Sequence, residues 1–114
     1  MVEHITKYQQ GKEAYIDMTQ KETRLQRKEI LNEKLSQEYE SIMIGGTQCF
    51  LIRDGMVCRI DSIGGEYDAL VIEYAENLEL AQKNIFGEDG DLFFMDEFDE
   101  EEMLEAMKKE IEEA

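Results

Sequence analysis

The sequence predicts an α+β fold, with a mainly antiparallel sheet of about four to five strands, an N-terminal helix, a short middle helix and a C-terminal amphipathic helix. The 114 residues suit a single domain, 1–114, with one hydrophobic core. Short apolar segments separated by glycine turns fill the middle of the chain, and apolar residues at helical spacing stand on either side of them. Strands that follow one another through short turns favour antiparallel pairing.

The N-terminal part of the chain predicts a helix over residues 19–40. Residues 1–18 are interpreted either as a short helix interrupted at Gly11 or as a loosely ordered arm. Two successive segments fit a capping box, Thr19 with Glu22 and Thr23 with Gln26, and the helix is predicted to start at one of them. Its narrow apolar stripe consists of Leu31, Leu35 and Tyr39. Its basic residues alternate with acids, so we expect them to pair with the acidic C-terminal half, within the chain or between subunits.

The middle of the chain, residues 41–74, is predicted to form strands. Segment 41–44 is either a first strand or the last turn of the preceding helix, and its isoleucines favour the strand. Segments 48–53 and 56–63 form a predicted hairpin, and 68–74 follows a Gly-Gly turn as a further strand. A glutamate in that last strand, Glu73, interrupts an apolar run, and facing solvent or pairing with Arg59 is its simplest interpretation.

The hairpin turn sets the predicted register of its two strands. A two-residue loop at Asp54-Gly55 places Cys49 and Cys58 diagonally on one face, about 7 Å apart and too far for a disulfide. A one-residue bulge would change this facing. One face is then predicted to carry Cys49, Leu51, Met56, Cys58 and Ile60, and the other Phe50, Ile52, Val57, Arg59 and Asp61. Because both faces are largely apolar, helices or a partner subunit should cover both.

The C-terminal part predicts a short helix at 77–86, a strand at 91–95 and a helix at 99–113. The short helix rests on Leu78, Ala81 and Ile85 at helical spacing. Asp99 and Glu102 form a predicted capping box at the start of the last helix, and Phe98 with Met103 forms a hydrophobic staple. The predicted buried stripe of this helix consists of Met103, Met107 and Ile111.

Negative charge dominates the chain and lies mostly in its C-terminal part. The formal net charge is −16, and residues 47–114 hold 20 acids against 5 bases, a net of −15. Such a surface repels nucleic acids and anionic membranes and favours basic partners. No apolar run approaches the ~20 residues that cross a bilayer. The N-terminus has no secretory pattern, so we expect no membrane association and a cytoplasmic location.

Candidate chemistry is sparse. Asp89, Asp91 and Glu100 match positions of a calcium-binding loop, but phenylalanines occupy the fifth and sixth positions, where that loop needs an oxygen ligand and a glycine. The single histidine, His4, and the isolated cysteines match no zinc spacing and no nucleophile–base arrangement. The sequence therefore predicts no metal, no cofactor and no catalytic residues.

These observations predict a small acidic protein-binding protein, of an inhibitor or toxin-immunity type, that engages a basic protein partner. The predicted partner-binding residues are Asp89, Asp91, Asp96, Glu97, Asp99, Glu100 and Glu101. The alternative is a self-associating, homodimeric structural or regulatory module, in which the apolar stripe of the first helix pairs between subunits. Sequence leaves the oligomeric state and the partner's identity open.

Overall fold

The computed structural model describes residues 20–87 and 89–114 and has the α+β fold that the sequence predicts. Five antiparallel strands form one sheet in the order β1-β2-β3-β4-β5. The strands are β1 (Glu40–Ile44), β2 (Thr47–Leu51), β3 (Val57–Ile63), β4 (Ala69–Ala75) and β5 (Asp89–Phe94). The helices are an N-terminal helix over residues 20–35, α2 (Leu78–Gln82) and α3 (Glu100–Glu113). The predicted arm at 1–18, His4 and Thr19 lie outside the described residues.

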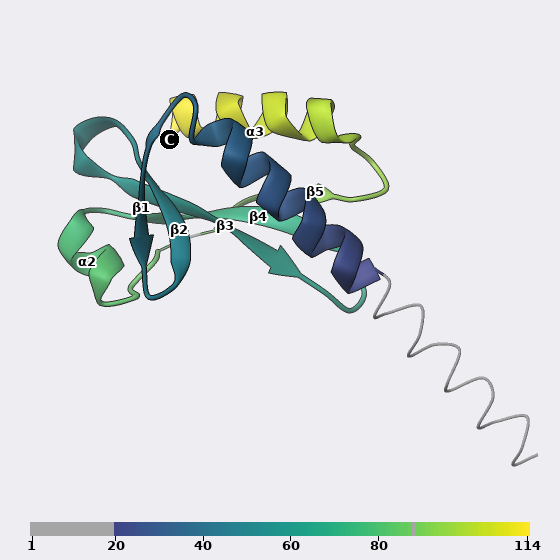
Figure 1. Cartoon of the computed structure of the whole chain (residues 1–114), viewed down its shortest axis with the longest axis horizontal. Coiled ribbons are helices and arrows are strands. Elements are labelled where there is room, and N and C mark those ends of the chain that lie inside the picture. The colour runs from purple at the N-terminus through teal and green to yellow at the C-terminus, as the bar shows by residue number, and fades with distance from the viewer. Residues whose placement is uncertain (1–19, 88) are drawn as a thin grey trace, which may run out of the picture.

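The helices cover the two faces of the sheet unequally. The N-terminal helix and α3 lie over one face, and the short helix α2 lies at the opposite face near one end of the sheet (Figure 1). The larger apolar cluster accordingly joins both long helices to the sheet, and a smaller cluster joins α2 to the sheet. Both faces are therefore covered by the chain's own helices, one of them only in part.

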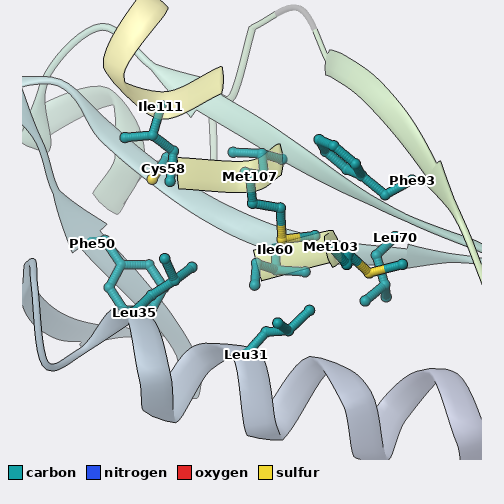
Figure 2. Packing of buried hydrophobic residues seen from close by; sticks show 11 residues of the cluster. Leu31, Leu35, Phe50, Cys58, Ile60, Leu70, Phe93, Met103, Met107 and Ile111 are labelled. Carbon is teal, nitrogen blue, oxygen red and sulfur yellow. The ribbon is translucent and has the colours of Figure 1, made fainter. Parts of the chain in front are cut away.

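The main core lies between the sheet and the two long helices. Leu31 and Leu35 reach into it from the N-terminal helix, and both are fully buried. Figure 2 shows these leucines together with Met103, Met107 and Ile111 from α3 and with Phe50, Cys58, Ile60, Leu70 and Phe93 from the sheet. Burying one such side chain contributes about 1.5–3 kcal/mol. The two leucines of the predicted apolar stripe are thus buried in the chain's own core.

The hairpin register differs from the predicted one by a single residue. The Asp54-Gly55 turn forms as expected, with both residues in the left-handed region (φ 58° and 78°). A bulge lies immediately before the turn, because Met56 N–H donates to the Arg53 carbonyl (3.1 Å) while the Met56 carbonyl accepts from Ile52 N–H (2.9 Å). Ile52 and Arg53 therefore both stand opposite Met56.

The bulge makes the predicted division of the hairpin faces wrong. Phe50 pairs with Cys58, and Leu51 pairs with Val57. Cys58 consequently lies in the main core, whereas Cys49 lies in the small cluster on the other face. The two cysteines are on opposite faces rather than diagonal on one face, so they are even less suited to a disulfide than predicted.

Several element boundaries also differ from the predicted ones. The first helix ends at residue 35 rather than 40, because Glu40 pairs with Leu51 as the first residue of β1; segment 41–44 is therefore strand. Helix α2 is shorter than the predicted 77–86, because Asn84 adopts a left-handed conformation (φ 60°) that stops it. Thr23 lies inside the N-terminal helix and does not cap it.

The last helix matches its prediction in detail. The Asp99 carboxylate accepts from Glu102 N–H (2.8 Å), and the Glu102 carboxylate accepts from Asp99 N–H (3.1 Å), which completes the capping box. Its buried residues are Met103, Met107 and Ile111. Caps and stripes of this kind depend only on residues within a few positions, so sequence locates them well.

Candidate functional site

The predicted partner-binding acids lie on three consecutive segments that begin with the edge strand β5. Asp89 and Asp91 belong to the edge strand β5. Asp96 and Glu97 lie in the turn that follows β5, and both are exposed. The remaining three, Asp99, Glu100 and Glu101, form the cap and first turn of α3.

Two of these acids are engaged within the molecule. Asp99 caps α3, and its carboxylate is held by Glu102 N–H. The Glu100 carboxylate binds the Lys34 ammonium at 2.8 Å, joining α3 to the N-terminal helix. The hydrogen bond that Lys34 donates to Glu100 raises the pKa of Lys34. The expected pairing of first-helix bases with the acidic half therefore occurs within the chain, at Lys34 and, through Asp68, at Arg24.

Four acids have exposed side chains and form no ion pair with any residue that the structure describes: Asp91, Asp96, Glu97 and Glu101. We call them the acidic face. An exposed carboxylate without an internal partner keeps its full negative charge available to another molecule.

A groove of about 670 Å³ runs between the edge strand β5 and helix α3. Its apolar lining comes from Leu92, Phe93, Phe94, Phe98 and Ala106. Its charged lining comes from Asp91, Glu97, Glu110 and Glu113, with Lys109 as the one base. This β5–α3 groove therefore combines apolar surface with a negative rim, and it shares Asp91 and Glu97 with the acidic face.

Glu110 of α3 links the helix to the edge strand. Its Oε1 accepts a hydrogen bond from Asp91 N–H (3.0 Å), and its Oε2 is buried without a hydrogen-bond partner among the described residues. The carboxylate occupies the space that a side chain at position 90 would need, so Gly90 permits this contact. Burial raises the pKa of the Glu110 carboxyl, although the hydrogen bond from Asp91 N–H opposes this rise.

The sequence analysis missed Glu110. The signal for it is position, since Glu110 follows Met103 by seven residues and Met107 by three, which places an acid on the buried side of α3. Tyr74 of β4 belongs to the same cluster. Burial, followed by the negative charge of Glu110, raises the pKa of the Tyr74 hydroxyl.

The glutamate that interrupts β4 has a structural role. The Glu73 carboxylate accepts from Arg59 Nε at 3.0 Å, as the sequence suggested, in directly paired positions of β3 and β4. Arg59 also donates to the Asn84 side chain (2.8 Å) and lies over the Phe86 ring, 3.8 Å from its centroid. This guanidinium therefore ties the small α2 layer to the sheet.

Both cysteine thiols are free and buried, which has a chemical consequence that can be measured. Burial raises the pKa of the Cys58 thiol to about 12 and also raises the pKa of Cys49. At about pH 8, well below the pKa of Cys58, that thiol stays protonated, and only a thiolate attacks a disulfide reagent. Burial also keeps the reagent away from Cys49. We expect no reaction of the folded protein with an aromatic disulfide reagent and two equivalents after unfolding in urea, followed by absorbance. Rapid consumption of two equivalents by the folded protein would contradict this burial.

The fold and the groove define a class: a small acidic α+β protein, built on an antiparallel meander, with an open groove at one edge of its sheet. No protein-family model, no curated protein and no solved structure matches the chain. Within residues 20–87 and 89–114, no three His, Cys, Asp or Glu side chains come together as a metal site would need. In the same described part, no helix is long and apolar enough to cross a membrane.

Proposed function

We propose that this chain is a small acidic protein-binding protein whose β5–α3 end engages a basic protein partner, in an inhibitor or immunity-type role. The observation that carries this proposal is the exposed, unpaired acidic face beside a groove with apolar lining. Complementary charge steers the encounter and selects the partner. Apolar side chains that lose contact with water on binding supply most of the affinity.

Internal ion pairing strengthens this proposal. The N-terminal helix holds half of the basic residues in the described part of the chain, and several of them bind acceptors in the C-terminal half. Arg27 donates to the Phe98 carbonyl at 2.8 Å, and Lys34 binds Glu100. These bases join the N-terminal helix to the start of α3. None of them forms an ion pair with the acidic face.

Self-association remains the alternative function, with a different basis from the one that sequence suggested. Leu31 and Leu35 of the helix stripe are fully buried in the chain's own core, and Tyr39, beyond the end of the helix, is partly buried against it, so the stripe does not support the dimer. What favours self-association is the other edge strand, β1, where Met43 is 66% exposed. We also propose the cytoplasm as the compartment, since two buried, unpaired thiols suit a reducing environment.

The acidic-face proposal predicts a charge-dependent capture experiment. Tagged wild-type protein, the triple variant Asp96→Asn/Glu97→Gln/Glu101→Gln and a matched control are used in parallel on source-cell lysate, with washes at about 0.1 and 0.5 M salt. The control, Glu40→Gln/Asp54→Asn/Glu76→Gln, loses the same charge from exposed positions elsewhere. We expect wild type and control to retain one dominant basic protein, and the triple variant to retain less than about a tenth of it.

Two further results complete this test. The captured protein should be depleted by the high-salt wash, because shorter Debye lengths weaken charge-steered contacts. Both variants should unfold within about 1 kcal/mol of wild type, since exposed acids contribute little to stability beyond the helix-dipole term at Glu101. Equal retention by the triple variant and the control would refute the acidic-face proposal.

A further inference from the structure

The edge strand β5 leaves part of its backbone unpaired beside the groove. Met95 N–H donates to the Asp68 carbonyl (2.9 Å), and Phe93 stands opposite Leu70. Because hydrogen-bonded and non-hydrogen-bonded pairs alternate along an antiparallel ladder, Leu92 and Phe94 direct their N–H and C=O groups away from β4. The Phe94 carbonyl is occupied, since it accepts from the N–H groups of the following turn at 3.1 and 3.3 Å. Three outward groups remain: both from Leu92 and the N–H of Phe94.

Glu110 limits where a new strand can pair with this edge. Its carboxylate already accepts from Asp91 N–H, so it blocks the edge at that residue. The open edge thus begins at Leu92 and runs toward the turn after Phe94. This short open segment lies along the β5–α3 groove, because Leu92, Phe93 and Phe94 are all part of the groove lining.

The groove and the opposite side of the strand offer different chemistry to the side chains of an added strand. On the groove side lie four carboxylates and one ammonium, together with the apolar surfaces of Phe98 and Ala106. Leu92 and Phe94 border the groove as part of β5, but they alternate with Phe93, so their side chains point to the opposite face of the strand. On that face the Tyr67 ring lies 6.4 Å from the Phe94 ring, and Tyr67 is 52% exposed. Successive side chains of a strand point to opposite faces, so an added strand would meet negative charge and apolar surface alternately.

We propose that the β5–α3 groove binds an extended basic segment of the partner protein as an additional strand on β5. Lysine or arginine side chains at alternate positions enter the groove, and the apolar side chains between them lie on Leu92, Phe94 and Tyr67. The long stems of the basic residues pack on Phe98 and Ala106 while their charged ends reach the carboxylates. Main-chain hydrogen bonds to the edge supply affinity, as in other strand-addition complexes. The proposal rests on the proposed function and specifies the partner segment.

Charge argues against a second copy of this chain as the occupant. A second β5 would bring its own Asp91 to a groove that already holds Glu97, Glu110 and Glu113. Like charges placed across paired strands are destabilising. A segment of opposite charge gains from the same carboxylates, so the occupant is a basic strand from a different protein.

Peptide backbones test the added strand directly. The probe is a peptide of about seven residues that alternates lysine and valine, with both ends blocked and a fluorescent label. Two derivatives carry the same side chains and charge, one N-methylated at every lysine and the other at every valine. In a strand these two sets of N–H groups point to opposite edges. Anisotropy with the full chain at low salt measures the three affinities.

Strand addition predicts that one N-methylated peptide loses more than about tenfold in affinity, because its methyl groups remove the N–H that donates to the Leu92 carbonyl and hold the peptide backbone away from the edge of β5. The other should change less than about threefold, since its methyl groups face solvent. All active peptides should bind less tightly to Glu97→Gln/Glu113→Gln and unchanged to Glu40→Gln/Glu76→Gln, in which the lost acids are exposed and outside the groove. Circular dichroism confirms that each variant is folded.

Each contrary outcome has a definite meaning. Equal affinities for all three peptides, still reduced by Glu97→Gln/Glu113→Gln, would overturn strand addition and leave a charge-based partner site in place. Equal losses for both methylated peptides, or no binding of the parent peptide, would also overturn it. The proposed function is tested separately, by the capture experiment with the acidic-face variant.

Discussion

Replacing Phe50 with alanine is expected to lower the free energy of unfolding by about 3–5 kcal/mol. The Phe50 side chain is fully buried, in β2, on the face of the sheet that the two long helices cover. Figure 2 shows its ring beside Leu35 of the N-terminal helix. Removing the ring leaves a cavity that the sheet and helix cannot close. The loss is a large part of the roughly 5–15 kcal/mol that stabilises a typical domain.

Urea denaturation followed by circular dichroism measures this loss. The control is Met43→Ala, which removes an apolar side chain that is 66% exposed on the edge strand β1. We expect the control to change the free energy of unfolding by less than about 0.5 kcal/mol. A loss below about 1 kcal/mol for Phe50→Ala would contradict its place in the core, and with it the bulged register that puts Phe50 and Cys58 on the same face.

Replacing Asp68 with asparagine is expected to cost about 3 kcal/mol, because it leaves a buried guanidinium without its counter-charge. Arg24 Nη1 lies 2.7 Å from Asp68 Oδ1, and the Arg24 side chain is only 5% exposed. Arg24 Nε has no hydrogen-bond partner among the described residues, so the carboxylate is its main compensation. Asparagine suits this position, since Asp68 adopts a left-handed conformation (φ 41°) that asparagine tolerates.

Two comparisons separate the buried pair from a general effect of charge. Glu79→Gln breaks the exposed pair with Lys83 (3.2 Å) and should cost less than about 0.5 kcal/mol. Adding Arg24→Met to Asp68→Asn should recover part of the loss, because the uncompensated charge is then gone. Equal stability of Asp68→Asn and Glu79→Gln would show that the Arg24–Asp68 pair is solvated rather than buried.

Ion pairs between elements engage several of the basic residues that the structure describes. Arg24, Arg27 and Lys34 of the N-terminal helix bind acceptors on the strand-to-strand connection and around the start of α3. Lys108 of α3 binds Glu38, which follows the C-terminal end of the N-terminal helix, with 3.1 Å between Nζ and Oε1. The positive charges of these four side chains therefore take part in contacts between elements of the fold. Asp91, Asp96 and Glu97, by contrast, are exposed and form no ion pair with the described residues.

Sequence located the features that depend on neighbouring residues. The capping box of α3, its stripe of Met103, Met107 and Ile111, and the Asp54-Gly55 turn each need only a few consecutive positions. Glycine turns between apolar segments were likewise enough to indicate an antiparallel sheet, and the fold class followed from these local patterns.

The tertiary structure settled what depends on residues far apart in the chain. A single bulged residue at Ile52 and Arg53 reversed the facing of β3 relative to β2, which no local pattern revealed. Lys34 and Glu100 are 66 residues apart, so their pairing exists only once both helices pack on the sheet. The same packing buries the leucine stripe and brings Glu110 over Gly90 at the edge of β5. Charge and periodicity follow from the order of residues, whereas the choice between a free acid and a paired one follows from three-dimensional contact.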